Sequence, residues 1–445
     1  GFVERVDVAA VPERIRGRIE GLTGGLVGRR SLDIGEIERD LVLAADTPGT
    51  TLRSTLTAGR EPGGSVLVLE ARHRPITGTL SADNAVSSAT GGVQTTLAVQ
   101  ANGVFGFGEQ VYLQAGGLPR LGGDGDWFGA TPRNRQLSIG AVVPLGLAGT
   151  TLNLEATRTD SAPSPTGAFT FASRFERLSA RLRHPLVRSR AFSLFAELAF
   201  DAEEEELRSV APVAAALSLD RLRVARASQE VSWTTPWGAL LDARATASFG
   251  IDGLGARNAA SATVLLPLSR QGADADFRKF EVALQYGQTL HPHLAIDLFG
   301  RAQTSFGMAL PRAEQFSLTG ATALSAFDTG TLQGDSGLVG RLELSSPWQV
   351  EVPGGLAVVS PYGFGAWGKA WLMQPTAVET AAVRAAAWGL GLKLGAAPRS
   401  QGDPASGGAN NSLEQVNLTL EWGHQNRSDG VRAGDRFRIQ GAIRF

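Results

Sequence analysis

The sequence predicts a mainly β protein: a sixteen-stranded antiparallel transmembrane β-barrel, preceded by a small domain of β-α-α-β-β order. Three observations predict it. The last strand-like segment alternates strictly between apolar and polar side chains, the period of a strand with one face in lipid. No run approaches the roughly 18 apolar residues of a membrane helix, and the mean hydropathy is -0.03. Similar alternating segments, separated by turn-forming residues, fill most of the chain.

The final strand shows the alternation most clearly. In residues 435–445, Phe437, Ile439 and Ile443 fall on one face, and Arg436 and Arg438 fall on the other. A barrel turns the first face to lipid and the second to a wet interior. An edge strand of a soluble sheet is the alternative for this segment alone, and the many similar segments favour the barrel.

Composition narrows the class of protein. The formal net charge is -1, which gives no argument for binding nucleic acid. The chain has no cysteine, so disulfides and thiolate metal sites are excluded. Residue 1 is Gly and no signal peptide is present, so we expect a mature or trimmed chain with upstream sequence missing.

The sequence offers no catalytic or cofactor motif. Gly-x-Ser-x-Gly and His-Glu-x-x-His are absent, so we expect no enzyme activity, no catalytic residue and no cofactor. His291-Pro292-His293 is predicted to be a turn rather than a metal site, because no carboxylate cluster lies nearby in the sequence. Residues 122–126 contain oxygen ligands but lack the rest of an EF-hand loop, so no metal site is predicted there either.

Residues 1–74 differ from all that follows and are predicted to form a domain of their own. A short strand holds Phe2 and Val6, and a helix after Pro12 has apolar residues at three-to-four spacing. A second helix begins at Asp33, with Glu36 placed as in a capping box. Its apolar stripe is expected to consist of Ile34, Ile37, Leu41 and Ala45. Strands over 50–57 and 65–72 complete the order.

This order resembles a POTRA domain, specifically the membrane-proximal one of two-partner secretion transporters. The matching phrases are Glu38-Arg39-Asp40-Leu41, Asp46-Thr47-Pro48-Gly49, and Leu56-Thr57-Ala58-Gly59 with Pro62-Gly63. The resemblance implies a periplasmic domain that binds an extended client polypeptide by adding it to a sheet edge. We expect strand 50–57 to be that edge, with the backbone amides of Arg53 and Thr55 among its free donors. The expected binding residues are Thr51, Arg53 and Thr55.

Residues 75–445 are predicted to form the barrel. Alternating segments lie at 76–84, 92–101, 106–116, 135–145, 150–159, 173–184, 190–202, 219–233, 237–251, 276–290, 293–306, 336–346, 355–373, 381–396, 413–425 and 435–445. Their number is even, as a single-chain bacterial barrel requires. Short turns such as 184–189 are expected on the periplasmic side, opposite long loops at 117–133, 203–218 and 252–275. The acidic run 203–206 is expected to be a solvated loop entrance.

The stretch 276–344 carries the strongest family signal. It includes Glu314-Gln315-Phe316-Ser317-Leu318-Thr319-Gly320, Leu332-Gln333-Gly334-Asp335-Ser336-Gly337 and Arg341-Leu342-Glu343-Leu344. These phrases resemble the segment around the long sixth extracellular loop of two-partner secretion transporters. The turn His184-Pro185-Leu186-Val187-Arg188-Ser189-Arg190 is similar to another phrase of that family. The resemblance covers essentially the whole chain.

The chain departs from the family at its most diagnostic motifs. Members carry Val-Arg-Gly-Tyr/Phe at the loop tip, where this chain has Leu324, Ser325, Ala326 and Phe327, followed by Asp328. Members also carry Phe-x-Asp-x-Gly on the next wall strand, where this chain keeps only Phe364 and Gly368 and has Ala366 in place of the Asp. Ser325 and Ala366 therefore suggest a joint replacement of an ion pair. We expect the loop 308–335 still to fold into the lumen, held by Phe327 packing and by Asp328 on a lumen-facing arginine.

The resemblance implies an outer-membrane transporter that secretes an unfolded partner polypeptide through its barrel, with the N-terminal domain in the periplasm. The expected partners are a secreted exoprotein, outer-membrane lipid and lipopolysaccharide, and the barrel-assembly machinery for insertion; no nucleic acid is expected. One alternative is a BamA-like factor that inserts other barrels through its seam. Another is a passive porin, which needs no POTRA domain.

Overall fold

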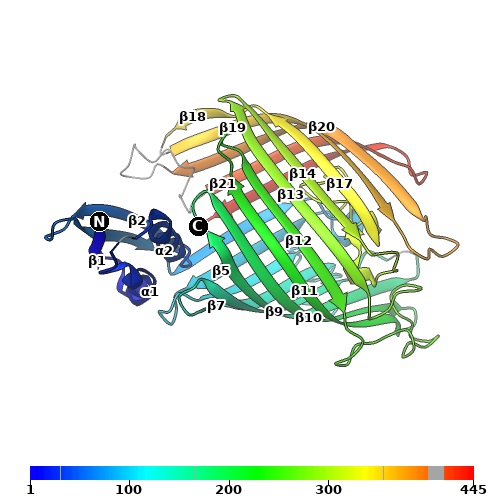
Figure 1. Cartoon of the computed structure of the whole chain (residues 1–445). Helices are drawn as coiled ribbons and strands as arrows, with labels where there is room; N and C mark the ends of the chain where they lie inside the picture. Colours follow the sequence, from blue (N-terminus) through cyan, green and yellow to red (C-terminus); the bar gives the residue numbers. More distant parts are fainter. Residues whose placement is uncertain (31, 166, 354, 399–414) are drawn as a thin grey trace.

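In a computed structural model of the chain, a small N-terminal domain adjoins one end of a closed β-barrel (Figure 1). The structure describes every residue except 31, 166, 354 and 399–414. No helix in the described part is long and apolar enough to cross a membrane. The predicted mainly β fold class is confirmed.

The N-terminal domain follows the predicted order. It consists of β1 (Phe2–Ala10), α1 (Glu13–Thr23), the short η1 (Gly24–Leu26), α2 (Ile34–Ala45), β2 (Thr50–Ala58) and β3 (Gly64–His73). Its sheet has the order β1-β3-β2, with β1 parallel and β2 antiparallel to the central strand. The predicted stripe of α1 is correct, because Ile15 and Ile19 are fully buried in the core between helices and sheet.

The helix α2 differs from its prediction in two details. Asp33 is the N-cap residue, but its side chain accepts no capping hydrogen bond, and Glu36 pairs with Arg29 at 3.0 Å instead of closing a capping box. Ile34 is 80% exposed at the start of the helix, and Ala45 is exposed at its end. The period of 3.6 residues selects a stripe that begins one turn later. Its members are Ile37, Leu41, Leu43 and Ala44.

The barrel wall forms near the predicted positions, but the strands at 170–188, 192–211 and 215–234 are longer than predicted and the short strand at 348–352 was not predicted. It consists of β4 (Ile76–Asp83), β5 (Gln94–Asn102), β6 (Gln110–Gly117), β7 (Asn134–Leu145), β8 (Thr150–Ser161), β9 (Thr170–Arg188), β10 (Phe192–Ala211), β11 (Ala215–Thr234), β12 (Leu240–Gly250), β13 (Arg278–His291), β14 (Leu294–Thr304), β17 (Ser336–Ser345), β18 (Trp348–Val352), β19 (Gly355–Trp371), β20 (Ala382–Pro398), β21 (Gln415–Arg427) and β22 (Gly434–Arg444). Because β17 and β18 lie end to end against β19, the described wall has sixteen positions, as predicted. Residues 413 and 414 of one predicted strand lie outside the described part.

The last strand closes the barrel against the first. Gly78 and Phe445 exchange backbone hydrogen bonds of 2.9 and 3.0 Å, and the Ile439 amide donates to Asn84 Oδ1 at 2.9 Å. Through Gln440–Arg444 and Thr79–Asp83 the described strands close into a barrel, which pairs backbone groups that would be costly to leave unpaired in lipid. The predicted faces of β22 are correct: Phe437 is 53% exposed on the outside, and Arg438 is 7% exposed inside.

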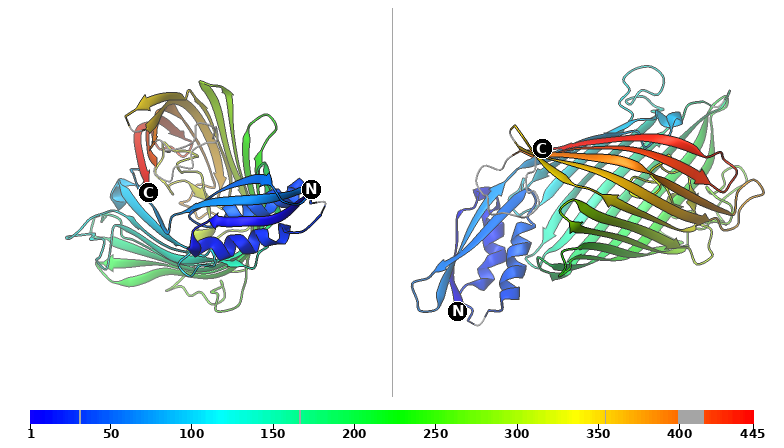
Figure 2. Two further views of the ribbon diagram at one scale, coloured as in Figure 1. Left: turned by 90° about the vertical axis from the view of Figure 1, so that its left-hand side faces the viewer. Right: turned by 90° about the horizontal axis from the view of Figure 1, so that it is seen from above.

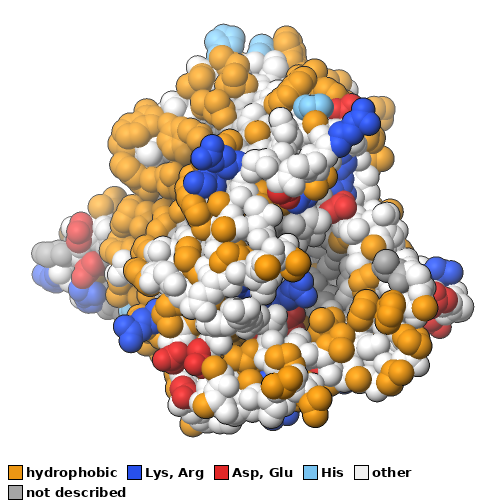
Figure 3. All heavy atoms as spheres, turned by 90° about the vertical axis from the view of Figure 1, so that its right-hand side faces the viewer, with side chains coloured by type: hydrophobic (Ala, Val, Ile, Leu, Met, Phe, Trp, Pro, Cys, Tyr) orange, Lys and Arg blue, Asp and Glu red, His pale blue; other side chains and the backbone are white. Residues whose placement is uncertain are grey.

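The N-terminal domain lies at the end of the barrel that carries the short turns (Figure 2). Arg188, next to the turn 189–191, forms a two-pronged ion pair with Asp46 of the domain, at 2.6 and 2.8 Å. The amide of Arg190 donates to Glu38 Oε1 at 2.7 Å, and Arg18 donates to the carbonyl of Gly146 at 2.5 Å. As predicted, residues 292–293 form a tight turn at this end. The opposite end carries the longer loops and mixes apolar, basic and acidic side chains (Figure 3).

One predicted loop is wrong. Residues 203–218 belong mostly to the long hairpin of β10 and β11, whose connection is only 212–214. Glu203 is not at a solvated loop entrance, because it is 4% exposed on the inner face and forms an ion pair of 3.1 Å with Arg226. The run of four carboxylates looked like a loop in the sequence, but a strand turns alternate members to opposite faces.

Candidate functional site: a loop docked in the barrel lumen

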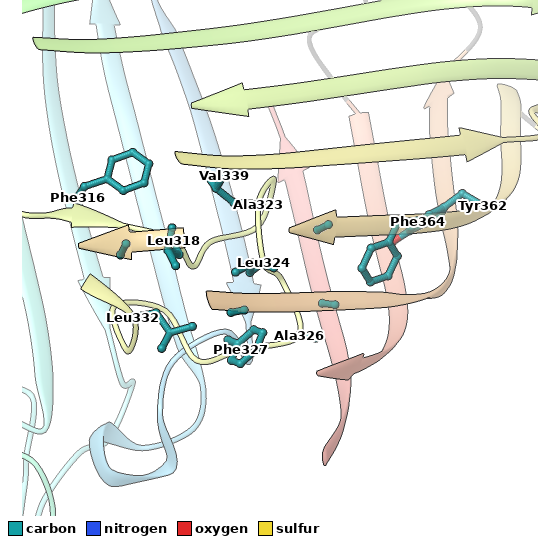
Figure 4. Packing of buried hydrophobic residues seen from close by; sticks show 14 residues of the cluster. Phe316, Leu318, Ala323, Leu324, Ala326, Phe327, Leu332, Val339, Tyr362 and Phe364 are labelled. Carbon is teal, nitrogen blue, oxygen red and sulfur yellow. The ribbon is translucent and has the colours of Figure 1, made fainter. Parts of the chain in front are cut away.

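The connection between β14 and β17, residues 305–335, packs against the inner face of the wall, and we call it the lumen loop. It contains η3 (Arg312–Glu314) and a two-stranded sheet of β15 (Phe316–Ser317) and β16 (Gln333–Gly334). Its apolar side chains form one buried cluster with inward-facing residues of β17, β19 and β20 (Figure 4). The loop members of this cluster are Phe316, Leu318, Ala323, Leu324, Ala326, Phe327 and Leu332.

The base of the lumen loop is held by a buried carboxylate. Glu314 is 1% exposed, and its two oxygens accept from Arg226 of β11 at 2.6 and 3.1 Å. Lys279 of β13 lies 2.7 Å from the same carboxylate. A buried carboxylate is tolerated only when it is paired and hydrogen-bonded, and here two cations meet that requirement.

The loop tip is held by a second charged group, which we call the tip clamp: Ser325, Arg341, Glu421 and Tyr362. Arg341 of β17 donates to Ser325 Oγ at 2.6 Å, and Ser325 Oγ donates to Glu421 Oε1 of β21 at 2.5 Å. Arg341 also donates to the other oxygen of Glu421 at 2.7 Å, and Tyr362 of β19 donates to that oxygen at 2.8 Å. A hydroxyl both donates and accepts, so one serine bridges the cation and the anion.

The tip clamp is buried, and its positive and negative charges nearly balance. Arg341 and Glu421 are 7% and 3% exposed, and Ser325 is 3% exposed. The guanidinium carbon of Arg341 lies 3.8 Å from the ring centre of Phe364, a geometry that favours a cation. Glu343 pairs with both Arg341 and Lys393, so two cations face two carboxylates on this part of the wall.

The residues after Ser325 reach the seam between the last and first strands. Phe327 is 4% exposed within the apolar cluster. Asp328 forms an ion pair of 2.5 Å with Arg436 of β22, and the Thr329 amide donates to the carbonyl of Ala85, just after β4, at 2.9 Å. The structure thus places both residues as the sequence suggested, and it joins the tip to both sides of the seam.

Small residues of the wall allow the loop to approach closely. A Cβ on Gly368 would lie 3.0 Å from Leu318 Cδ2, and a Cβ on Gly423 would lie 2.9 Å from the Cβ of Ala326. Ala366 packs in the apolar cluster and is 8% exposed. Ala366 lies opposite Arg341 in the β17–β19 register, and the polar partners of Ser325 are Arg341 and Glu421.

A buried aspartate ties the lumen loop to two other loops at the end opposite the N-terminal domain. Asp335 is 0% exposed and forms an ion pair of 2.6 Å with Arg270 of the loop 251–277. It also accepts the amides of Leu310, at 3.0 Å, and of Met373, at 2.6 Å. Asp335 is therefore a junction of three loops, a role that its sequence phrase did not reveal.

The strand β2 lies at an edge of the N-terminal sheet, because no described strand pairs with its outer side. The amide of Gly59 donates to the carbonyl of Gly64, and the amide of Arg74 donates to the carbonyl of Gly49. Between these two hydrogen bonds the β2–β3 register is unbroken. Antiparallel pairs alternate, so the amides of residues 51, 53 and 55 point to β3, and those of 52, 54 and 56 point outward. The expectation that Arg53 and Thr55 are the free edge donors is therefore wrong; the outward donors are Leu52, Ser54 and Leu56.

Comparison with known proteins identifies the family. A family model described as haemolysin secretion/activation protein ShlB/FhaC/HecB matches residues 63–394. The chain belongs to this family. It is an outer-membrane β-barrel transporter of the two-partner secretion type. No curated protein sequence matches it.

Solved structures agree in fold. CdiB from Escherichia coli superposes with a TM-score of 0.74 at 18% identity, covering 100% of this chain and 76% of that one. CdiB from Acinetobacter baumannii superposes with a TM-score of 0.69 at 14% sequence identity, covering 100% of this chain and 74% of that one. BamA from Haemophilus ducreyi lacking POTRA domains 1-3 is more distant. Its TM-score is 0.57 at 11% sequence identity, covering 100% of this chain and 84% of that one.

In this chain the cation that contacts the loop tip comes from the wall. Ser325 stands where the family motif places an arginine, and the guanidinium beside it belongs to Arg341. The sequence analysis missed Arg341, Glu421 and Arg436 as partners of the tip. Alternation along each strand shows that these charged side chains point into the lumen. It does not show which residue across the lumen each of them contacts.

Proposed function

We propose that this transporter moves an unfolded partner polypeptide through its lumen, and that the lumen loop leaves its docked position during each passage. The observation that carries the proposal is the way the tip is held. Hydrogen bonds from Ser325 to Arg341 and Glu421, an ion pair of Asp328 with Arg436 and a small apolar cluster join the tip to the wall without a covalent bond. Such a dock can open reversibly, because its polar groups can exchange their partners for water or for the backbone of the client.

We infer that the N-terminal domain, residues 1–74, is a periplasmic POTRA domain that captures the client. Its order of elements and its open β2 edge support this role, because an extended chain can add to such an edge as a new strand. The polar contacts that Asp46 and Glu38 make with the barrel hold the domain beside the lumen on the short-turn side. Short turns are the periplasmic side of bacterial barrels.

The other roles belong to the same proposal. The chain inserts with the barrel-assembly machinery and contacts outer-membrane lipid and lipopolysaccharide with its apolar outer face. The family is one of transporters, and the described residues contain no group of three potential metal ligands. Folding of the client outside the cell then drives transport. A BamA-like use of the seam receives less support, since BamA is a more distant structural neighbour and Gln440–Arg444 of β22 pair with Thr79–Asp83 of β4.

A reversible crosslink tests the route. The chain has no cysteine, so Ala326→Cys with Gly423→Cys introduces the only thiols, at positions where ideal Cβ atoms lie 2.9 Å apart. The two Cβ atoms of a disulfide usually lie about 3.8 Å apart, so the loop must move outward by about 1 Å to form the bond. Secretion of the exoprotein by cells carrying the oxidised pair should stop and should return with reductant. Each single-cysteine variant is the matched control. Normal secretion by the fully crosslinked protein would exclude the lumen route.

A further inference from the structure

Two carboxylates of the barrel wall lie directly opposite each other on its inner face, Glu205 on β10 and Asp220 on β11. Residues paired across neighbouring antiparallel strands share a face, with Cβ atoms about 5 Å apart. Asp220 is 1% exposed, and the other cross-strand partner of Glu205 is Phe175 of β9. The row of Phe175, Glu205 and Asp220 therefore brings two negative charges together and contains no cation.

One oxygen of each carboxylate has no protein partner. Glu205 Oε2 and Asp220 Oδ2 are shielded from solvent, and neither accepts a hydrogen bond from the described residues. Glu203, on the same face of β10, forms an ion pair of 3.1 Å with Arg226, whereas no described residue forms an ion pair with Glu205 or Asp220. Buried carboxylates are tolerated when they are paired, hydrogen-bonded or bound to a metal ion. The two oxygens therefore favour a shared partner of positive charge.

Two arginines of the adjacent loops act on these carboxylates electrostatically, but neither neutralises them by direct contact. Arg312, in η3 of the lumen loop, acts on Glu205, and its own side chain is exposed. Arg257 acts on Asp220, but its guanidinium donates to the carbonyl oxygen of Leu219 at 2.6 Å. The two free oxygens are therefore available to a cation from solution.

We propose that Glu205 and Asp220 bind one divalent cation of the hard, oxygen-preferring class, Ca²⁺ or Mg²⁺, between their free oxygens. Both ions take carboxylate oxygens as ligands and complete their coordination with carbonyl oxygens and water. Two carboxylates that face each other supply the charged part of such a site. The site is independent of the client and of the direction of transport, because it depends on the pairing of β10 with β11.

A cation at this site would also strengthen the attachment of the lumen loop. Asp220 Oδ1 accepts the amide of Ser269, in the loop 251–277, at 2.8 Å, and Ser269 Oγ accepts the amide of Arg312 at 3.0 Å. Asp220 thus connects β11 with the long loop and with the base of the lumen loop. Because the cation binds the folded state, it should stabilise the barrel against thermal unfolding.

Cation titration tests the proposal. The purified whole chain in detergent is stripped with a chelator, dialysed, and titrated in a calorimeter with CaCl₂ and, separately, with MgCl₂. The variant is Glu205→Gln with Asp220→Asn, which keeps the shape of both side chains and removes their charge. The matched control is Glu204→Gln, the preceding residue on β10, whose carboxylate lies on the other face and pairs with Arg221 at 2.8 Å. Cations bound by other carboxylates or by residual lipopolysaccharide contribute equally in all three proteins.

The wild type and the control should each bind one equivalent of Ca²⁺ or Mg²⁺ that the double variant binds at least about tenfold more weakly. The same cation should raise the midpoint of thermal unfolding of the wild type and the control, but not that of the double variant. Circular dichroism shows whether each variant folds, and Asp220→Asn alone replaces the double variant if the two changes together prevent folding. Equal binding by the wild type and the variant, or a wild-type midpoint that responds to neither cation, would overturn the site.

Discussion

The buried charges of the tip clamp explain how a serine replaces an arginine at the loop tip. Arg341 and Glu421 are both within reach of Ser325, and each keeps a further partner on the wall. Removing one member of a buried ion pair leaves an uncompensated charge, which costs about 3–5 kcal/mol. With the cation on the wall, the Arg341–Glu421 pair survives when the tip leaves, and the ion pair that opening of the tip breaks is that of Asp328 with Arg436.

We expect Arg341→Leu to destabilise the folded barrel by about 3 kcal/mol, because Glu421 stays buried without its cation. Adding Glu421→Gln should recover part of the loss, since the double variant buries no unpaired charge. Urea unfolding in lipid vesicles measures the free energies for a double-mutant cycle. Arg384→Leu, on the exposed outer rim, is the control and should change little. Additive costs would show that the two residues do not interact.

The lipid face is tested by Leu198, which is 61% exposed on the outside of β10. We expect Leu198→Arg to cost about 2–4 kcal/mol if the residue lies at the bilayer midplane. Leu198→Ala separates lost apolar area from added charge and should cost less. Folding into vesicles is the readout. An arginine that is as well tolerated as the alanine would place this residue away from the lipid core.

At the scale of elements, the β2–β3 ladder decides which amides of β2 are free for the strand addition proposed above. Leu52, Ser54 and Leu56 direct their amides outward, and their odd-numbered neighbours bond β3. The proposed capture therefore depends more on the outward amides than on the side chains of β2.

We expect Ser54→Pro with Leu56→Pro to remove outward donors and reduce secretion, while the N-terminal domain stays folded. Arg53→Pro with Thr55→Pro is the matched contrast, because it breaks the β2–β3 ladder and should unfold the domain. Secretion assays measure the loss of capture. The difference between the circular dichroism spectra of the whole protein and of its barrel fragment, residues 75–445, shows whether residues 1–74 stay folded. Undiminished secretion by a folded Ser54→Pro, Leu56→Pro protein would move client capture elsewhere.

The positions of the elements could be predicted from the sequence, whereas their partners across the lumen could not. Alternation along one strand fixes its two faces, so Phe437 was placed correctly on the outside. Glu203 was misplaced because a run of four carboxylates suggested a loop. In a strand, alternate members of such a run point to opposite faces, and Glu203 points inward. The bonds from Ser325 to Glu421 and from Asp328 to Arg436 join segments about a hundred residues apart, and such contacts depend on barrel closure rather than on local pattern.

At the scale of the whole molecule, the lumen loop links three parts of the barrel. Its base is tied to β11 and β13 through Glu314, and its middle packs on β19. Its tip joins β21, β22 and Ala85, two residues after β4. Asp335 connects it to the loops of the end opposite the N-terminal domain. Undocking the tip would therefore release contacts on both sides of the seam at once.

The central claim is that the wall cation Arg341 docks the loop tip through Ser325, and relocating that cation tests it most directly. Single-channel conductance in planar bilayers is measured for Ser325→Arg, for Arg341→Ser and for the two combined. Ser325→Arg alone places a second cation beside Arg341, so the tip should undock and conductance should rise. Combining it with Arg341→Ser returns one cation to Glu421, and conductance should fall back to the wild-type level. Strictly additive changes, or a wild-type level in Ser325→Arg alone, would contradict the docked tip.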